Sequence, residues 1–186
     1  MAINKVIYGG DTLIDLTSDT VEASDVMAGV SFHSADGVAR VGSYVPSVTL
    51  SACSAKGSAN VTLNQNTPKK LTLNTMITNT DSDAFEISNG GIKCKKAGVV
   101  QVSGACYIAS TGAGTMGTYI FNGSSEMTSG MGYAASGNVS YATTVAPMYV
   151  EISAGTIFYL YARHSASKGT AYSGNAATHL SLMYVD

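Results

Sequence analysis

The sequence is poor in charged residues, in proline and in long apolar runs, and it contains no tryptophan. Only 12% of its 186 residues are charged, which is about half the share in an average globular domain. The formal net charge is −2, so the chain lacks the basic surface of a nucleic-acid-binding domain. No apolar run approaches the roughly 20 residues of a membrane-spanning helix. We therefore expect neither a nucleic-acid partner nor insertion into a membrane.

Cysteine is scarce as well, with Cys53, Cys94 and Cys106 as the only three. Their odd number and the lack of a short Cys-x-x-Cys spacing argue against a disulfide framework and against a zinc site. We expect free thiols in a protein that is made in a reducing cytosol. Asn4 and Lys5 interrupt the first apolar residues, so we expect no secretory signal.

The abundant residues favour a β-sheet protein. Apolar residues make up 45% of the chain, and glycine contributes 20 residues. A disordered chain would have less apolar content, and a coiled coil would have more charge. Short apolar segments alternate with turns that contain Gly and Asn, which is typical of a sandwich or barrel. Strands are predicted at residues 48–53, 70–79, 84–88, 91–94, 98–110, 117–121, 141–152, 157–164 and 179–185.

The chain divides near residue 46 into an acidic part and a slightly basic part. Residues 1–46 hold six acidic and two basic residues, for a net charge of −4, whereas the remainder carries +2. The first part is predicted to form short strands, a short helix and a hairpin around Asp36-Gly37. It is too small to build a self-sufficient core, so it is either a satellite of the main domain or a docking module. Residues 47–59 are expected to be a linker or first strand, and residues 60–186 the main β domain.

No arrangement of residues predicts catalysis or metal binding. The chain has no Gly-x-Ser-x-Gly elbow to accompany its three histidines. A pair of aspartates resembles a calcium loop that lacks the remaining ligands. The aspartates of this pair are Asp81 and Asp83. His164, at a strand end, and the lysines Lys93, Lys95 and Lys96 are interpreted as solvent-exposed. We expect no enzymatic activity and no cofactor.

Two of the predicted strands carry large side chains on both faces. Phe158 and Leu160 alternate with Tyr159 and Tyr161 along one strand, and residues 179–185 alternate in a similar way. A strand with two apolar faces is usually covered on both sides. Either another copy of the chain covers the second face, or a tyrosine-rich face is half exposed in a monomer.

A series of weak motifs runs through residues 60–186 in a fixed order. It includes a strand led by Gly98, a strand that ends at Asn122-Gly123, two apolar strands around Ala154-Gly155-Thr156, and the closing strand 178–184. This order resembles the jelly-roll head of the tumour necrosis factor and complement globular-head families. The resemblance implies an all-β protein with a C-terminal jelly-roll β-sandwich that forms a homotrimer, preceded by a small mixed α+β module. The trimer contacts that it implies are Tyr149, Tyr159, Tyr161, His179, Ser181 and Met183.

The first part of the chain carries a longer motif. It reads KVIYGGDTLIDLT at residues 5–17, followed by DTV at 19–21 and ADG at 35–37. This motif resembles an N-terminal module of virion proteins in tailed bacteriophages of Gram-positive hosts. The resemblance implies that the module attaches to phage capsid or tail proteins, in a virion assembled in the bacterial cytoplasm. The attachment residues that it implies are Val6, Ile7, Tyr8, Leu13, Ile14 and Leu16.

Together the two resemblances imply a trimeric surface appendage, either a head fibre or a tail fibre, whose knob adheres to the host. A host cell-surface polysaccharide is the expected receptor. Tyr133 and Tyr172, in loops predicted at residues 130–137 and 171–175, are the candidate receptor-binding residues. The alternative is a capsid decoration protein with a mainly structural role.

Overall fold

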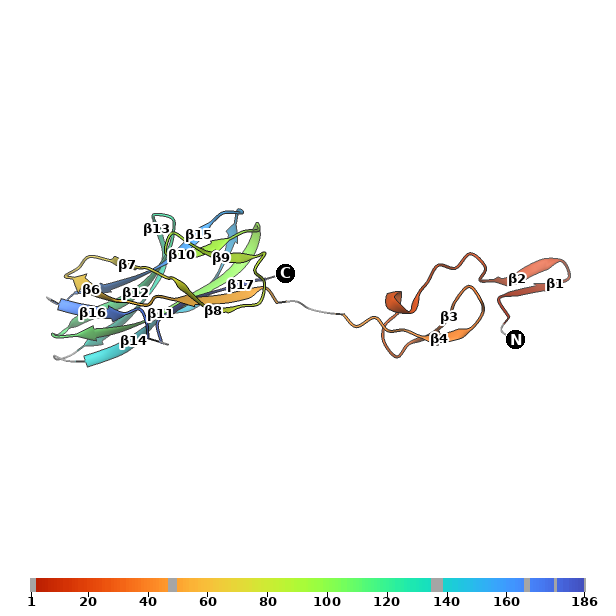
Figure 1. Cartoon of the computed structure of the whole chain (residues 1–186), viewed down its shortest axis with the longest axis horizontal. Helices are drawn as coiled ribbons and strands as arrows, with labels where there is room; N and C mark the ends of the chain where they lie inside the picture. The colour runs from red at the N-terminus through yellow and green to blue at the C-terminus, as the bar shows by residue number, and fades with distance from the viewer. Residues whose placement is uncertain (1–2, 47–49, 135–138, 166–167, 176, 186) are drawn as a thin grey trace. The chain divides into compact units, whose positions relative to one another are not determined.

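The computed structural model describes residues 3–46, 50–134, 139–165, 168–175 and 177–185. The chain forms two compact units, Met1–Thr49 and Leu50–Asp186. Strands β1 to β4 belong to the first unit, and β5 to β17 belong to the second (Figure 1). Within the described ranges, no helix is long and apolar enough to cross a membrane.

The first unit begins with a tight hairpin of β1 (Lys5–Tyr8) and β2 (Asp11–Asp15). Gly9 and Gly10 connect the two strands with φ angles of +61° and +91°. Both central residues of a type I′ turn need this left-handed conformation, which glycine adopts without strain. An ion pair of 2.8 Å between Lys5 Nζ and Asp15 Oδ2 joins the other end of the hairpin. The local sequence therefore fixes this hairpin by itself.

A second hairpin forms where the Asp-Gly turn predicts one. It pairs β3 (Ser31–His33) with β4 (Ala39–Val41). In the turn, Asp36 Oδ1 accepts hydrogen bonds from the Ser34 hydroxyl at 2.6 Å and from the Val38 amide at 3.0 Å.

The predicted short helix is only a single 3₁₀ turn, η1 (Ala23–Asp25), which a Glu22–Asp25 capping box begins. It ends at once because Val26 is extended. The Val26 carbonyl accepts a hydrogen bond from the Tyr44 amide, which holds the chain out of a helical path.

The second unit is a sandwich of two antiparallel sheets, named here after their central strands. The β15 sheet has the order β13-β12-β15-β10-β9, with β7 also paired to β15. The β11 sheet has the order β6-β16-β11-β17-β5-β8, with β14 also paired to β11. In the β15 sheet the strands are β7 (Lys69–Leu71), β9 (Phe85–Ser88), β10 (Gly91–Cys94), β12 (Gly114–Asn122), β13 (Ser125–Ala134) and β15 (Ile157–His164). In the β11 sheet they are β5 (Ala52–Lys56), β6 (Asn60–Asn64), β8 (Thr75–Asn79), β11 (Gly98–Ser110), β14 (Val139–Ile152), β16 (Lys168–Tyr172) and β17 (His179–Tyr184).

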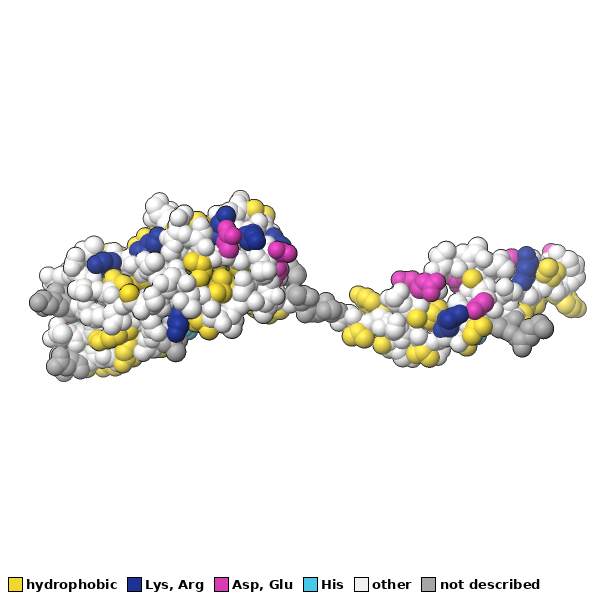
Figure 2. Space-filling view, viewed as in Figure 1, with side chains coloured by type: hydrophobic (Ala, Val, Ile, Leu, Met, Phe, Trp, Pro, Cys, Tyr) yellow, Lys and Arg dark blue, Asp and Glu magenta, His cyan; other side chains and the backbone are white. Residues whose placement is uncertain are grey.

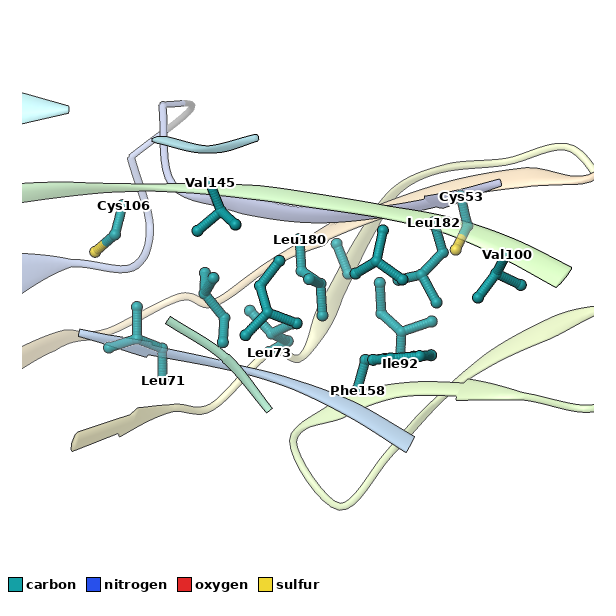
Figure 3. Packing of buried hydrophobic residues seen from close by; sticks show 14 of the residues in the cluster. Cys53, Leu71, Leu73, Ile92, Val100, Cys106, Val145, Phe158, Leu180 and Leu182 are labelled. Atoms are coloured by element: carbon teal, nitrogen blue, oxygen red, sulfur yellow. The ribbon is translucent and has the colours of Figure 1, made fainter. Parts of the chain in front are cut away.

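The core lies between the two sheets, as Figure 3 shows for ten labelled side chains. Phe158 and Leu160 of β15 belong to the same core cluster as Leu180 and Leu182 of β17, and each of the four is at most 2% exposed. Along both strands, buried and half-buried residues alternate, so the predicted inward faces are confirmed. Burying a side chain of this size contributes about 1.5–3 kcal/mol.

Residues 52–56 belong to this sandwich and not to a spacer. They form β5, which lies between β17 and β8 in the β11 sheet. Cys53 lies opposite Leu182, and Ala55 is fully buried. Of the expected linker, residues 47–49 lie outside the described residues.

The predicted single strand over residues 70–79 is in fact two strands in different sheets. β7 pairs with β15, whereas β8 pairs with β5. The chain passes between the sheets at residues 72–74, where Leu73 is buried in the core. A continuous apolar pattern does not reveal such a crossing, because both strands contribute to the same core.

The two sheets approach each other closely where β13 meets β14. A Cβ atom at Gly130 would collide with the backbone carbonyl of Thr144. Nearby, the buried Thr118 hydroxyl of β12 donates a hydrogen bond of 2.9 Å to the Thr143 carbonyl. Glycine is therefore required at this point, since a backbone atom cannot move aside as a side chain can.

The substitution Gly130→Ala should lower the free energy of unfolding by about 2–3 kcal/mol, as overpacking in a core does. Gly132→Ala on the same strand is the matched control, because its Cβ would meet only the Thr143 methyl group at 3.3 Å. Urea denaturation of both variants measures the difference. Equal stability of the two variants would contradict the close approach of β13 and β14.

Candidate interaction surfaces

The outer face of the β11 sheet carries no charge along its two central strands. From β11 and β17, the side chains that point away from the core are small, polar, aromatic or aliphatic, and none is charged. They are Val99, Gln101, Ser103, Ala105, Tyr107, Ala109, His179, Ser181 and Met183. We refer to these residues as the uncharged face. A face of this size without Lys, Arg, Asp or Glu is unusual for a surface that remains in water.

A hollow of about 290 Å³ lies in the uncharged face. Small side chains from neighbouring strands form its floor, among them Ala52, Ser54, Ser103 and Ser181. The Ser181 hydroxyl donates a hydrogen bond of 3.0 Å to the Ser54 hydroxyl across the floor. Met183 also lines the hollow. The hollow could accept a bulky apolar side chain from outside.

The six predicted trimer contacts do not form one surface. Tyr149, His179, Ser181 and Met183 lie on the outer face of the β11 sheet, where Tyr149 is exposed and accepts a hydrogen bond from Gln101. Tyr159 and Tyr161 lie on β15 in the other sheet and point away from the core. The core separates the two outer faces, so the six predicted contacts lie on two opposite sides of the sandwich. Their role as trimer contacts stays a prediction.

The predicted attachment residues of the first hairpin are largely exposed. Ile7 is 58%, Tyr8 77%, Leu13 62% and Ile14 49% exposed, whereas Val6 and Leu16 are half-buried. Among residues 3–46, only Gly42 is buried. Figure 2 shows hydrophobic side chains spread over the surface of this unit. The unit therefore has no hydrophobic core of its own.

The two candidate receptor-binding tyrosines lie on strands, and not in the predicted loops. Tyr133 is on β13, opposite Thr115, and is 66% exposed. Tyr172 is the last residue of β16, and its ring packs against Tyr107 with 5.7 Å between centroids. Residues 135–137 of the first predicted loop lie outside the described residues. Tyr133 and Tyr172 belong to different sheets, so they do not form one site.

His164 is fully buried, which corrects its prediction as an exposed loop residue. It ends β15, and its ring packs against Gly169, where a Cβ atom would lie 2.9 Å from His164 Cγ. The strand that follows, β16, thus returns directly over this histidine. Among the described residues, no group of three or more His, Cys, Asp or Glu side chains is placed to hold a metal ion.

The predicted acidic turn, which contains Asp81 and Asp83, has a structural role. Asp81 accepts hydrogen bonds from the Ser51 hydroxyl at 2.7 Å, from Lys96 Nζ at 3.0 Å and from the Asp83 amide at 2.9 Å. The hydrogen bond from Ser51, followed by that from Lys96, lowers the pKa of Asp81 to about 2. The carboxylate thereby joins the start of the sandwich at Ser51 to the β9–β10 region.

The lysine cluster is also engaged in local contacts. Lys93 forms an ion pair of 2.8 Å with Glu86, and Lys95 donates to the Ser82 carbonyl at 2.9 Å. Lys96 donates to Asp81, so each of the three lysines has a hydrogen-bond partner close by. The lysines therefore stabilise the turn around Asp81.

Because the pKa of Asp81 is lowered in the folded state, its contribution to stability is present above the unfolded value of about 4. It is lost as the pH falls through about 2. The stability difference between the natural chain and Asp81→Asn should therefore be full at pH 5–7 and shrink toward pH 2. Urea denaturation across this pH range measures it. Asp83→Asn is the control, and a constant difference for Asp81→Asn at all pH values would be inconsistent with the ion pair.

The three cysteines are free and buried in the sandwich. Burial raises the pKa of each thiol to about 12, so the reactive thiolate is scarce at neutral pH. In these positions cysteine serves as a small apolar side chain.

Neither a protein family nor a curated protein matches the sequence. Solved structures of the same fold do match. Eiger, a TNF from S. frugiperda, has a TM-score of 0.57 at 11% identity, over 75% of this chain and 94% of that chain. Murine APRIL at pH 5.0 has a TM-score of 0.57 at 9% identity, over 73% of this chain and 99% of that chain. Murine APRIL at pH 8.0 gives 0.56 at 8% identity, over the same shares.

At these identities the likeness shows the fold alone. The prediction of an all-β chain with a TNF-like jelly-roll sandwich is confirmed.

Proposed function

We propose that this chain is a non-enzymatic structural protein of a tailed-phage virion, a self-associating surface appendage of head-fibre or tail-fibre type. The first unit attaches it to a capsid or tail protein, and the sandwich is the knob that contacts the host surface. The observation that carries the proposal is the contrast between the two units. The sandwich has a complete core, whereas residues 3–46 bury only Gly42.

The first unit needs a partner surface for energetic reasons. Ile7, Tyr8, Leu13 and Ile14 belong to one hairpin and are each about half exposed or more. Covering a large apolar side chain completely contributes about 1.5–3 kcal/mol. A partner that covers this hairpin would stabilise both the docking contact and the unit itself. The phage-type motif of residues 5–17, which forms this hairpin, supports a virion protein as that partner.

Self-association through the uncharged face is the second element of the proposal, and a homotrimer is the state that the jelly-roll resemblance implies. The face lacks charges, and its hollow is lined by small side chains. A second copy could place an apolar side chain there without leaving a charge unpaired. Tyr149, His179, Ser181 and Met183 are the proposed contact residues.

A buried, unpaired carboxylate is strongly unfavourable, so the substitution Met183→Asp should dissociate the assembly. Tyr159→Asp, on the opposite sheet, should leave it intact. Size exclusion with light scattering at micromolar concentration should give about three chains' mass for the natural chain and for Tyr159→Asp. A monomeric natural chain would refute self-association, and a dissociated Tyr159→Asp would move the interface to the other sheet.

Attachment is tested by dividing the chain between its units. Residues 50–186 have their own core, so the truncated chain should fold and self-associate. It should not join phage particles that are assembled without the full chain. Residues 1–49 fused to an unrelated trimeric protein should bring that protein to the particle. Normal incorporation of residues 50–186 would mean that the sandwich itself is the attachment surface.

A further inference from the structure

The outer face of the β15 sheet gathers five aromatic side chains. The strand register places Tyr119 opposite Tyr161, and Phe121 opposite Tyr159. On the edge strand, Tyr133 lies opposite Thr115 and points to the same side. We refer to Tyr119, Phe121, Tyr133, Tyr159 and Tyr161 as the aromatic face. Neither the core nor the proposed trimer contact uses it, because it lies on the far side of the sandwich from the uncharged face.

Two rings of the aromatic face pack against each other, and a third is held in place over the backbone. The Phe121 and Tyr161 rings lie 4.3 Å apart between centroids with an interplanar angle of 36°. The Tyr119 ring lies over Gly117, where a Cβ atom would be 2.8 Å from it. Tyr119 is only 4% exposed, so it supports the neighbouring rings and does not itself contact a ligand. Phe121, Tyr159 and Tyr161 are half-buried, and Tyr133 is 66% exposed. The rings therefore form a preorganised surface that loses little conformational entropy on binding.

Two cations flank the tyrosines. Lys70 Nζ lies 4.0 Å from the centre of the Tyr159 ring, and it donates a hydrogen bond to the Asn89 carbonyl. Arg163 follows Tyr161 on the same side of β15, and it donates to Asn66 Oδ1 at 3.1 Å. Neither cation is paired with a carboxylate in these contacts. Positive charge is thus fixed beside Tyr159 and Tyr161.

The remaining charges of this face are nearly balanced. Lys93 of β10 is paired with Glu86. On β13, Glu126 lies opposite Phe121 at the end of the strand. The excess positive charge is therefore at Lys70 and Arg163, beside the tyrosines.

We propose that the aromatic face binds a polysaccharide that carries anionic groups, an inference that rests on the proposed role of the sandwich as a host-contacting knob. Sugar rings have flat C–H faces that stack on aromatic rings, and hydroxyl edges that bond to the phenol groups. Lys and Arg bind phosphate or carboxylate substituents of such a polymer. Tyr133 lies at the level of Thr115, six residues along β12 from Phe121. With strands roughly 4.8 Å apart and about 3.4 Å per residue, the face spans on the order of 10 by 20 Å, which suits several sugar units of an extended chain.

A second protein is a poorer match for this face. Protein interfaces centre on a desolvated apolar patch with few charges, whereas the centre of this face carries phenol groups beside two cations. A second copy of the chain would also bring the same two cations toward each other.

The test measures binding of the full-length protein to polysaccharide from the cell wall of the bacterium that the phage infects. Three probes are compared by calorimetry: the intact polymer, the polymer with its phosphate groups removed, and the polymer with its carboxylates reduced. Binding to the intact polymer should be lost with one of the two treated polymers, which identifies the anionic group. Unchanged binding to both would overturn the role of the cations.

Variants locate the site. Tyr133→Ala and the double variant Lys70→Gln/Arg163→Gln should each lower the affinity at least tenfold. The double variant should also weaken the salt dependence of binding. Tyr44→Ala in the first unit, where Tyr44 is exposed, and Lys56→Gln in the β11 sheet are matched controls, and they should bind as the natural chain does. Tyr133 is largely exposed, so its replacement should leave folding intact.

The outcomes separate this inference from the proposed function. If none of the aromatic-face variants changes binding, the inference is wrong, whatever the attachment experiment shows. If these variants dissociate the assembly in light scattering, the face is a contact between copies, and the inference is also wrong. If the protein joins virions through residues 1–49 but binds no wall polymer, the attachment stands, the inference fails, and the chain is a decoration protein.

Discussion

The central constraint on this protein is that each strand of the sandwich has only two faces, and the core requires one of them. The inward faces of β15 and β17 meet in a single cluster that includes Phe158, Leu160, Leu180 and Leu182. Any other role must then use an outward face, a loop or the first unit. This leaves two large outward surfaces of different chemistry. One is uncharged along β11 and β17 and lined by small side chains, and the other is aromatic with two cations beside Tyr159 and Tyr161.

The two-residue period of the strands made much of the sandwich predictable. It gave the all-β class, most strand positions and the inward faces of β15 and β17. It could not show which sheet a strand joins, because a strand in either sheet alternates in the same way. Alternation alone therefore groups Tyr159 and Tyr161 with His179, Ser181 and Met183, although the two sets lie on opposite sides of the core. The register of β12 against β15 was the missing information.

Glycine is a misleading signal for secondary structure in the β13 region. Gly130 and Gly132 predicted a loop, yet both lie in a regular strand whose close approach to β14 leaves no room for a side chain at Gly130. The prediction for His164 fails for a related reason. Its polar neighbours in the sequence predict solvent exposure, but β16 packs over its side chain. In the first unit the short-range signals were sufficient, since both hairpins form at their Gly-Gly and Asp-Gly turns.

The position of β5 in the β11 sheet has a consequence for how the chain folds during synthesis. β5 is the first strand of the sandwich, and it pairs with β17, the last; Ser54 and Ser181, which bond across them, are 127 residues apart in the chain. The β11 sheet therefore cannot close until synthesis of the chain is nearly finished. Contacts of such long sequence separation make folding slow, and they leave strand edges open in the nascent chain. Premature termination before β17 would remove the neighbour of both β5 and β11, and the released fragments would be prone to aggregate.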